Sequence, residues 1–195
     1  MASRQSLSII LVAIALLSAS SCGGALYKVK PSIELPPLAE NLKSASAGGV
    51  ALRASPLFSD EDNQDLFEAN LPLSGVLAVR VEMVFESGVP IEIKRARFRL
   101  RDGEAKEWKL VSAKDAISQV LKANEVYVYN PNSRKQFEKE FAAYSLDLKT
   151  PLSQSDRRRE GFLFFRTPRK DPVASPQGLV LSVDGLAQRV EIPLN

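Results

Sequence analysis

The stretch Val76–Phe85 reads VLAVRVEMVF and decides the fold class of this chain. Apolar side chains occupy every second position from Leu77 to Phe85, and Arg80 and Glu82 stand between them. A repeat of two residues is typical of a β-strand that buries one face. The sequence therefore predicts a long strand here, with one face in a hydrophobic core.

Turn-forming residues separate this strand from further strand segments. Gly88 and Pro90 predict a turn into a strand at 91–100, and Asp102 with Gly103 predicts a hairpin into a strand at 108–111. We expect these three strands to form an antiparallel meander. Short strands separated by frequent turns favour a β-sandwich. The other predicted strands are 50–54, 126–129, 162–166, 179–183 and Val190–Pro193.

Three helices are predicted between the strands. Ser59 and Ser112 are each followed three residues later by an aspartate, which is typical of a helix N-terminus. These signals predict one helix from 59 to about 69 and another from 112 to about 121. The longest predicted helix is 132–144, because three aromatic residues there share one face at helical spacing. They are Phe137, Phe141 and Tyr144, and we expect them to contact the core.

The composition is that of one globular domain with an appendage: 195 residues, of which 45% are hydrophobic and 25% charged. The net charge of +3 is too small to indicate a nucleic-acid partner. A single cysteine excludes an internal disulfide, and the lack of histidine removes the commonest metal ligand and general base. We therefore predict no catalytic residue, no metal site and no cofactor.

Residues 1–22, MASRQSLSIILVAIALLSASSC, have the order of a secretory signal: Arg4, an apolar run at 7–17, and small residues before Cys22. A transmembrane helix needs about 20 apolar residues to cross the bilayer, and this run of roughly 11 is too short. Residues 1–21 are therefore predicted to be a signal peptide that is removed.

The end of this segment, SASSC at 18–22, resembles the lipobox of bacterial lipoproteins, with Ala19 where leucine is more usual. The resemblance implies cleavage before Cys22 and lipid on its sulfur, which anchors the chain to a membrane. The alternative is ordinary signal-peptidase cleavage at Ala19 and Ser21, with Cys22 left as a free thiol. An unpaired cysteine is an oxidation liability in an exported protein, so lipidation explains its position better. Gly23 follows the cysteine. In the diderm lipoproteins that this segment resembles, a residue other than aspartate at that position implies the outer membrane, facing the periplasm.

Residues 22–48 read as a lipid-anchored linker because they lack a periodic pattern and contain Pro31, Pro36 and Pro37. Such a segment could reach on the order of 80 Å when fully extended. The alternative is that Ile33, Leu35 and Leu38 add an edge strand or pack on the domain. The folded domain is predicted to span residues 49–195.

Four segments together resemble uncharacterised bacterial lipoproteins with an immunoglobulin-like extracytoplasmic domain: 49–57 (GVALRASPL), 66–71 (LFEANL), 75–85, and 161–168 (GFLFFRTP). The resemblance covers roughly residues 48–195. It implies a mainly β protein with inserted helices, built as an immunoglobulin-like antiparallel β-sandwich. It also implies a binding or assembly module that has no shared catalytic residues.

Four arginines alternate along the predicted strand at 91–100 and its end: Arg95, Arg97, Arg99 and Arg101. Alternate residues project from one face about 7 Å apart, and guanidinium groups match phosphate in a bidentate geometry. This face could therefore bind anions such as lipid headgroups. The alternative is a solvated face balanced by nearby carboxylates such as Glu82, Glu86 and Glu92. A second cluster, Arg157, Arg158 and Arg159, is more typical of a soluble loop.

The leading hypothesis is a membrane-anchored, non-catalytic envelope lipoprotein that binds an envelope protein or an anionic lipid. A second is an envelope enzyme that uses a Ser118–Lys122 pair or the carboxylates Glu104 and Glu107. A third is a carrier of a lipid-like ligand, which predicts a large apolar cavity. The acidic run at 60–65 lacks the glycine and the final glutamate of a calcium loop, so helix capping explains it better.

Overall fold

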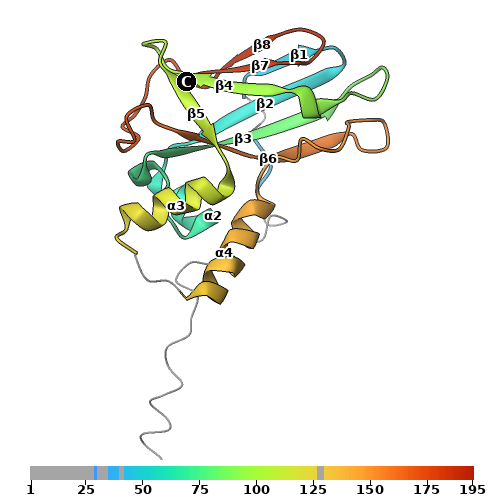
Figure 1. Ribbon diagram of the computed structural model, residues 1–195. Coiled ribbons are helices and arrows are strands. Elements are labelled where there is room, and N and C mark those ends of the chain that lie inside the picture. Colours follow the sequence, from blue (N-terminus) through green and yellow to red (C-terminus); the bar gives the residue numbers. More distant parts are fainter. Residues whose placement is uncertain (1–28, 30–34, 40–41, 127–129) are drawn as a thin grey trace, which may run out of the picture.

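In the part of the chain that the structure describes, eight antiparallel strands form one continuous sheet (Figure 1). That part of the computed structural model comprises residue 29 and residues 35–39, 42–126 and 130–195. The strand order is β1-β2-β3-β6-β5-β4-β7-β8. The strands are β1 (Ser44–Ala47), β2 (Val50–Leu57), β3 (Val76–Phe85), β4 (Arg97–Arg101), β5 (Glu107–Val111), β6 (Arg158–Arg166), β7 (Val180–Asp184) and β8 (Val190–Pro193).

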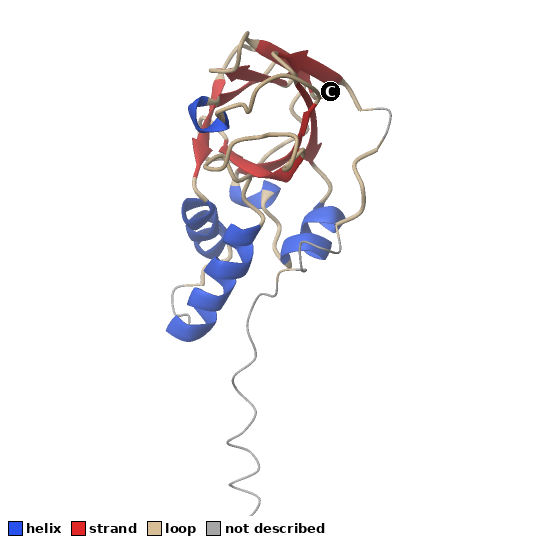
Figure 2. Cartoon of the chain, turned by 90° about the vertical axis from the view of Figure 1, so that its right-hand side faces the viewer, coloured by secondary structure: helices blue, strands red, loops and turns tan. Residues whose placement is uncertain are grey.

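The sheet curls until its two edge strands, β1 and β8, lie against each other. Figure 2 shows the strands as a ring, with the longer helices on one side of it. Opposite walls of a ring of eight strands are four positions apart, so β3 faces β7 and β6 faces β8. The domain is therefore a mainly antiparallel β structure with helices covering one wall.

The inner face of the curled sheet holds the larger hydrophobic core. On β3, residues 77, 79, 81, 83 and 85 all point into it and are almost completely buried. Leu52 of β2, Phe165 of β6 and Leu181 of β7 meet them from other strands. The predicted strand at Val76–Phe85 is confirmed to the residue, because its alternation matches the inner and outer faces of this sheet.

Three helices cover the outer face of β3 and β6: α2 (Asp60–Phe67), α3 (Ala113–Ala123) and α4 (Pro131–Ala143). The side-chain oxygens of Ser59 and Ser112 accept hydrogen bonds from the third residue beyond each, at 3.2 and 3.1 Å, so both predicted N-caps are confirmed. Asn130 caps α4 in the same way, and the helix begins one residue earlier than predicted.

An aromatic cluster joins these helices to the sheet. The ring of Phe67, at the end of α2, lies 5.0 Å from that of Phe141 on α4 and 5.4 Å from that of Phe162 on β6, measured between centroids. Phe164 stacks on Phe141 at 4.8 Å. The predicted aromatic face of the last helix is confirmed, since Phe137, Phe141 and Tyr144 are all buried here.

The predicted antiparallel meander is wrong in its first pairing, whereas the hairpin predicted at Asp102 and Gly103 is confirmed as the antiparallel pair β4–β5. β3 pairs with β2 and β6, whereas β4 pairs with β5 and β7. Between β3 and β4 the chain crosses to another wall, where Ile91 exchanges backbone hydrogen bonds with Leu152 and Ile93 is fully buried. The predicted strand at 91–100 is consequently broken by a 3-10 turn, η3 (Ile93–Arg95), and only its second half is β4.

The remaining predicted strands are largely confirmed. β8 has the predicted bounds, and the strands predicted at 50–54, 108–111, 162–166 and 179–183 are present as β2, β5, β6 and β7. β2 continues to Leu57, and β6 begins at Arg158. Most of the strand predicted at 126–129 lies outside the described residues.

The described N-terminal residues pack on the domain. Val29 and Leu35 contact the hydrophobic cluster under the helices, and Leu38 is buried. β1 pairs along its whole length with β2. The domain therefore begins before residue 49, and for Leu35 and Leu38 the packed alternative to a free linker is the one observed. Ile33 lies outside the described residues.

Candidate functional site

The predicted arginine face lies on the outer side of β4, but only three of its four members are on that strand. Arg97, Arg99 and Arg101 alternate with the buried Phe98 and Leu100. Arg95 belongs to η3, the 3-10 turn that precedes the strand. The prediction of four evenly spaced arginines on one strand is therefore wrong for Arg95: three arginines lie on one face of β4, and the fourth lies in the turn before it.

Two carboxylates partly neutralise the far end of this run. Arg99 Nε lies 3.9 Å from Asp184 Oδ2, and Arg101 Nη2 lies 3.1 Å from Glu191 Oε1. Arg189 bridges the same two acids, at 3.7 Å from Asp184 and 2.8 Å from Glu191. Glu191 and Asp184 are therefore the balancing acids, whereas the predicted Glu82 lies on β3, on another wall of the sheet.

A surface hollow of about 520 Å³ lies at the N-terminal end of β4, which we call the head of the strand. Gly185 forms one wall: its φ is +85°, and a β-carbon there would lie 2.2 Å from the carbonyl oxygen of Arg95. Only glycine allows the backbone of the β7–β8 turn to approach η3 this closely. The lining residues are Lys94, Arg95, Ala96, Arg97, Asp184 and Gly185, three cations and one carboxylate.

The second basic cluster serves the fold. Arg157 Nη2 donates to the carbonyl oxygen of Phe85, and Arg158 pairs with Glu82, with 2.7 Å between Nε and Oε1. Glu82 also accepts a 2.6 Å hydrogen bond from Arg53 Nε, so its carboxylate is held by two guanidinium groups from neighbouring strands. Sequence patterns missed this buried group, because its partners are 29 and 76 residues away.

Arg80, the other charged residue within β3, holds the N-terminal segment. Its side chain, 9% exposed, pairs with Glu160 on β6. Its Nη2 donates a 2.6 Å hydrogen bond to the carbonyl oxygen of Pro36. The described stretch 35–39 is thus tied to the outer face of β3 by a charge-assisted hydrogen bond as well as by apolar packing.

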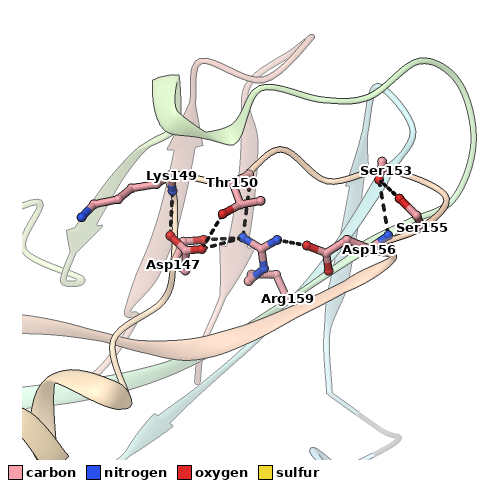
Figure 3. A network of polar contacts seen from close by, with 7 residues as sticks. All are labelled: Asp147, Lys149, Thr150, Ser153, Ser155, Asp156 and Arg159. Atoms are coloured by element: carbon pink, nitrogen blue, oxygen red, sulfur yellow. Dashed lines mark hydrogen bonds and ion pairs between the residues drawn. The ribbon is translucent and has the colours of Figure 1, made fainter.

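Arg159 fastens the loop between α4 and β6 (Figure 3). Its Nη1 donates to the carbonyl oxygens of Asp147 and Thr150, both at 3.1 Å, and lies 3.2 Å from Asp147 Oδ2. Its Nη2 pairs with Asp156. One guanidinium group therefore joins three points of a ten-residue stretch, 147–156. Both of its terminal nitrogens are engaged, so they are not available to bind a ligand in a bidentate manner.

This network makes the stability of the protein sensitive to acid. The backbone N–H of Lys149 donates to Asp147 at 2.9 Å, and with the Thr150 hydroxyl and Arg159 it lowers the pKa of Asp147 against the smaller opposing effect of partial burial. A lowered pKa stabilises the fold above the unfolded-state value of about 3.9, and this stabilisation is lost as the pH falls through the folded-state pKa. We expect Asp147→Asn to lower the midpoint of urea unfolding at pH 7, with the difference from wild type shrinking as the pH falls through the folded-state pKa of Asp147. A difference that stays constant as the pH is lowered would contradict this assignment.

A larger hollow, about 640 Å³, lies between the β4–β5 hairpin and the loop at 167–177. Trp108 is in its wall and donates from Nε1 to Asp102 Oδ2 at 3.1 Å. Partial burial raises the pKa of Asp102, but hydrogen bonds from Trp108 and two backbone N–H groups outweigh it and lower the pKa. Three carboxylates (Asp102, Glu104, Asp171) and two cations (Lys106, Arg169) line the hollow, so it favours neither sign of ligand.

The candidate catalytic groups do not converge. The hydroxyl of Ser118 donates to the carbonyl oxygen of Lys114, within its own helix, rather than contacting Lys122. Glu104 pairs with Lys106 at the hairpin tip, and Glu107 is exposed at the start of β5. Neither pair has the shared, water-excluding environment that general acid–base chemistry requires.

The chain was compared with protein-family models, curated proteins and solved structures. None of them matches it. The resemblance to lipoproteins with an immunoglobulin-like domain therefore stays a prediction from the sequence. Of the helices within the described residues, none combines the length and the apolar character needed to span a bilayer.

Proposed function

We propose that this protein is an exported lipoprotein, anchored by lipid on Cys22, whose β domain is a non-catalytic binding or scaffolding module of the cell envelope. The observation that carries the proposal is the position of Cys22: the only cysteine of the chain ends a segment with the basic, apolar and small-residue order of a secretory signal. The diacyl and N-acyl chains expected there would hold the protein permanently in a membrane, because each buried methylene adds about 0.8 kcal/mol.

The helical side of the domain is the side we assign to the membrane. Val29 and Leu35 pack in the cluster beneath the helices, and Arg80 holds the carbonyl oxygen of Pro36. Seven residue steps separate Cys22 from Val29, and a chain spans at most about 3.6 Å per residue. The anchor therefore lies within about 25 Å of Val29, which supports a domain held close to the bilayer.

For its fold, the proposal keeps the immunoglobulin-like sandwich that the resemblance implies. The support is that opposite walls of the curled antiparallel sheet pack their inner faces against each other across one core. Such modules commonly bind partners through an exposed strand edge or a polar face. Here the edge strands β1 and β8 have four residues each and lie against each other, so the arginine face is the better contact surface.

Cys22→Ser is the direct test of anchoring. We expect the variant to leave the membrane fraction or to accumulate as the uncleaved precursor, because serine cannot form the thioether to lipid. Fractionation of cells followed by mass spectrometry of the mature N-terminus measures both outcomes. Ser20→Ala keeps a small residue in the lipobox and is the matched control, expected to stay membrane-bound. Normal cleavage with unchanged membrane retention of Cys22→Ser would refute lipidation.

A further inference from the structure

We propose that the hollow at the head of β4 is a binding site for a phosphate group carried by a soluble or glycan-borne polyanion. The inference deepens the proposed function by assigning the arginine face a site and a ligand class. The inference depends on the proposed function in one respect, the orientation of the domain relative to the membrane. The site itself rests on Lys94, Arg95 and Arg97, three cations that line one hollow with Asp184 as the single carboxylate.

The cations at the head of the strand differ from those at its far end in how they are paired. Arg99 and Arg101 have acidic partners in Asp184 and Glu191. Among the described residues, Arg95 and Arg97 form no ion pair, and Lys94 has only an exposed contact with Glu92 at 3.3 Å. Exposed pairs of this kind contribute little, so they compete weakly with a ligand. Among the cations on β4 and in the turn before it, those without a close acidic partner are therefore the ones that line the hollow.

Phosphate is the chemical class that fits these groups best. Guanidinium groups donate two parallel hydrogen bonds to phosphate oxygens, and an ammonium group adds a point charge. A volume of about 520 Å³ lies within the usual range for small-ligand sites, so the hollow can admit a phosphate with part of its carrier. Gly185 keeps the opposite wall free of a side chain.

The position of the hollow favours a polyanion over the anchoring bilayer. β3 and β6 carry the helices and the N-terminal segment. The hollow is formed by the start of β4 and the end of β7, and the strand order places β7 opposite β3 in the ring of strands. If lipid on Cys22 brings the helical side toward the membrane, the hollow is directed away from it.

Two double variants of equal charge separate this site from a general basic surface. Arg95→Gln with Arg97→Gln removes two cations from the hollow. Arg101→Gln with Lys109→Gln removes two cations outside it and leaves Asp184 paired with Arg99. The mature full-length protein in a neutral detergent is titrated with inorganic tripolyphosphate by calorimetry. The Cys22→Ser protein, which lacks the anchor, is mixed without detergent with phosphatidylglycerol vesicles. We expect the first variant to weaken tripolyphosphate binding at least about tenfold and the second by less than about threefold.

Three results would overturn the site. They are an absence of tripolyphosphate binding by the wild type, equal weakening by both double variants, and binding to phosphatidylglycerol vesicles without binding to tripolyphosphate. The last result would assign the arginines to a bilayer instead. Cys22→Ser is titrated in parallel and is expected to bind tripolyphosphate like the wild type. Failure of anchoring is scored by fractionation alone, so it is distinguishable from failure of the phosphate site.

Discussion

Replacing Arg53 and Arg158 together by alanine is expected to lower the free energy of unfolding by about 3–5 kcal/mol. The two guanidinium groups are the partners of Glu82, whose side chain is only 2% exposed. A buried carboxylate without a cation keeps its desolvation penalty and loses the compensating attraction. Arg80 does not substitute for them, because it is committed to Glu160 and to the carbonyl oxygen of Pro36.

The single variants and a triple variant make this prediction sharp. Arg53→Ala or Arg158→Ala alone leaves one partner on Glu82, so each should cost much less than half of the double variant. Adding Glu82→Leu to the double variant removes the uncompensated charge and should recover about half of the loss or more. Urea unfolding followed by circular dichroism measures all four proteins. Simple additivity of the two single variants would show that Glu82 does not depend on the pair.

Phe67→Ala is expected to lower the free energy of unfolding by about 3–5 kcal/mol, the range for deleting a fully buried phenylalanine. Phe67 is completely buried and contacts aromatic rings from two other elements, Phe141 on α4 and Phe162 on β6. The variant loses these edge and tilted ring contacts and leaves a cavity between the helices and the sheet. Thermal unfolding monitored by circular dichroism measures the loss.

Leu73→Ala is the control for Phe67→Ala. Leu73 is 54% exposed, so its truncation should change stability by no more than about 0.5 kcal/mol. A loss below about 1 kcal/mol for Phe67→Ala would mean that the aromatic cluster is not what holds the helices on β3 and β6.

Local patterns in the sequence predict the elements of this fold well. The alternation in Val76–Phe85 defines β3 because every second side chain meets the same core. Ser59 and Ser112 define helix starts because the capping hydrogen bond depends only on neighbouring residues. Such signals are readable because the local secondary structure at these positions is determined by residues close together in the sequence.

Pairing and crossing could not be predicted in the same way. The run from Arg95 to Arg101 alternates without a break, yet backbone pairing begins only at Arg97, because the burial of Ile93 bends the chain before it. The partners of Glu82 come from β2 and β6, and no short-range pattern connects them. The hollow at the head of β4 depends on Gly185, which the sequence places about 90 residues from Arg95.

The pairing of β3 with β6 also determines what the chain exposes while it is being made. β2 can pair with one edge of β3 early, but the other edge waits for Arg158, about 70 residues after Phe85. Synthesis adds roughly 5–20 residues per second, so a ten-residue apolar strand keeps one open edge for several seconds. Strands of this kind attract other chains unless charged residues interrupt them. Arg80 and Glu82 are the charged residues that interrupt β3, and their partners on β6, Glu160 and Arg158, become available only when that strand is added.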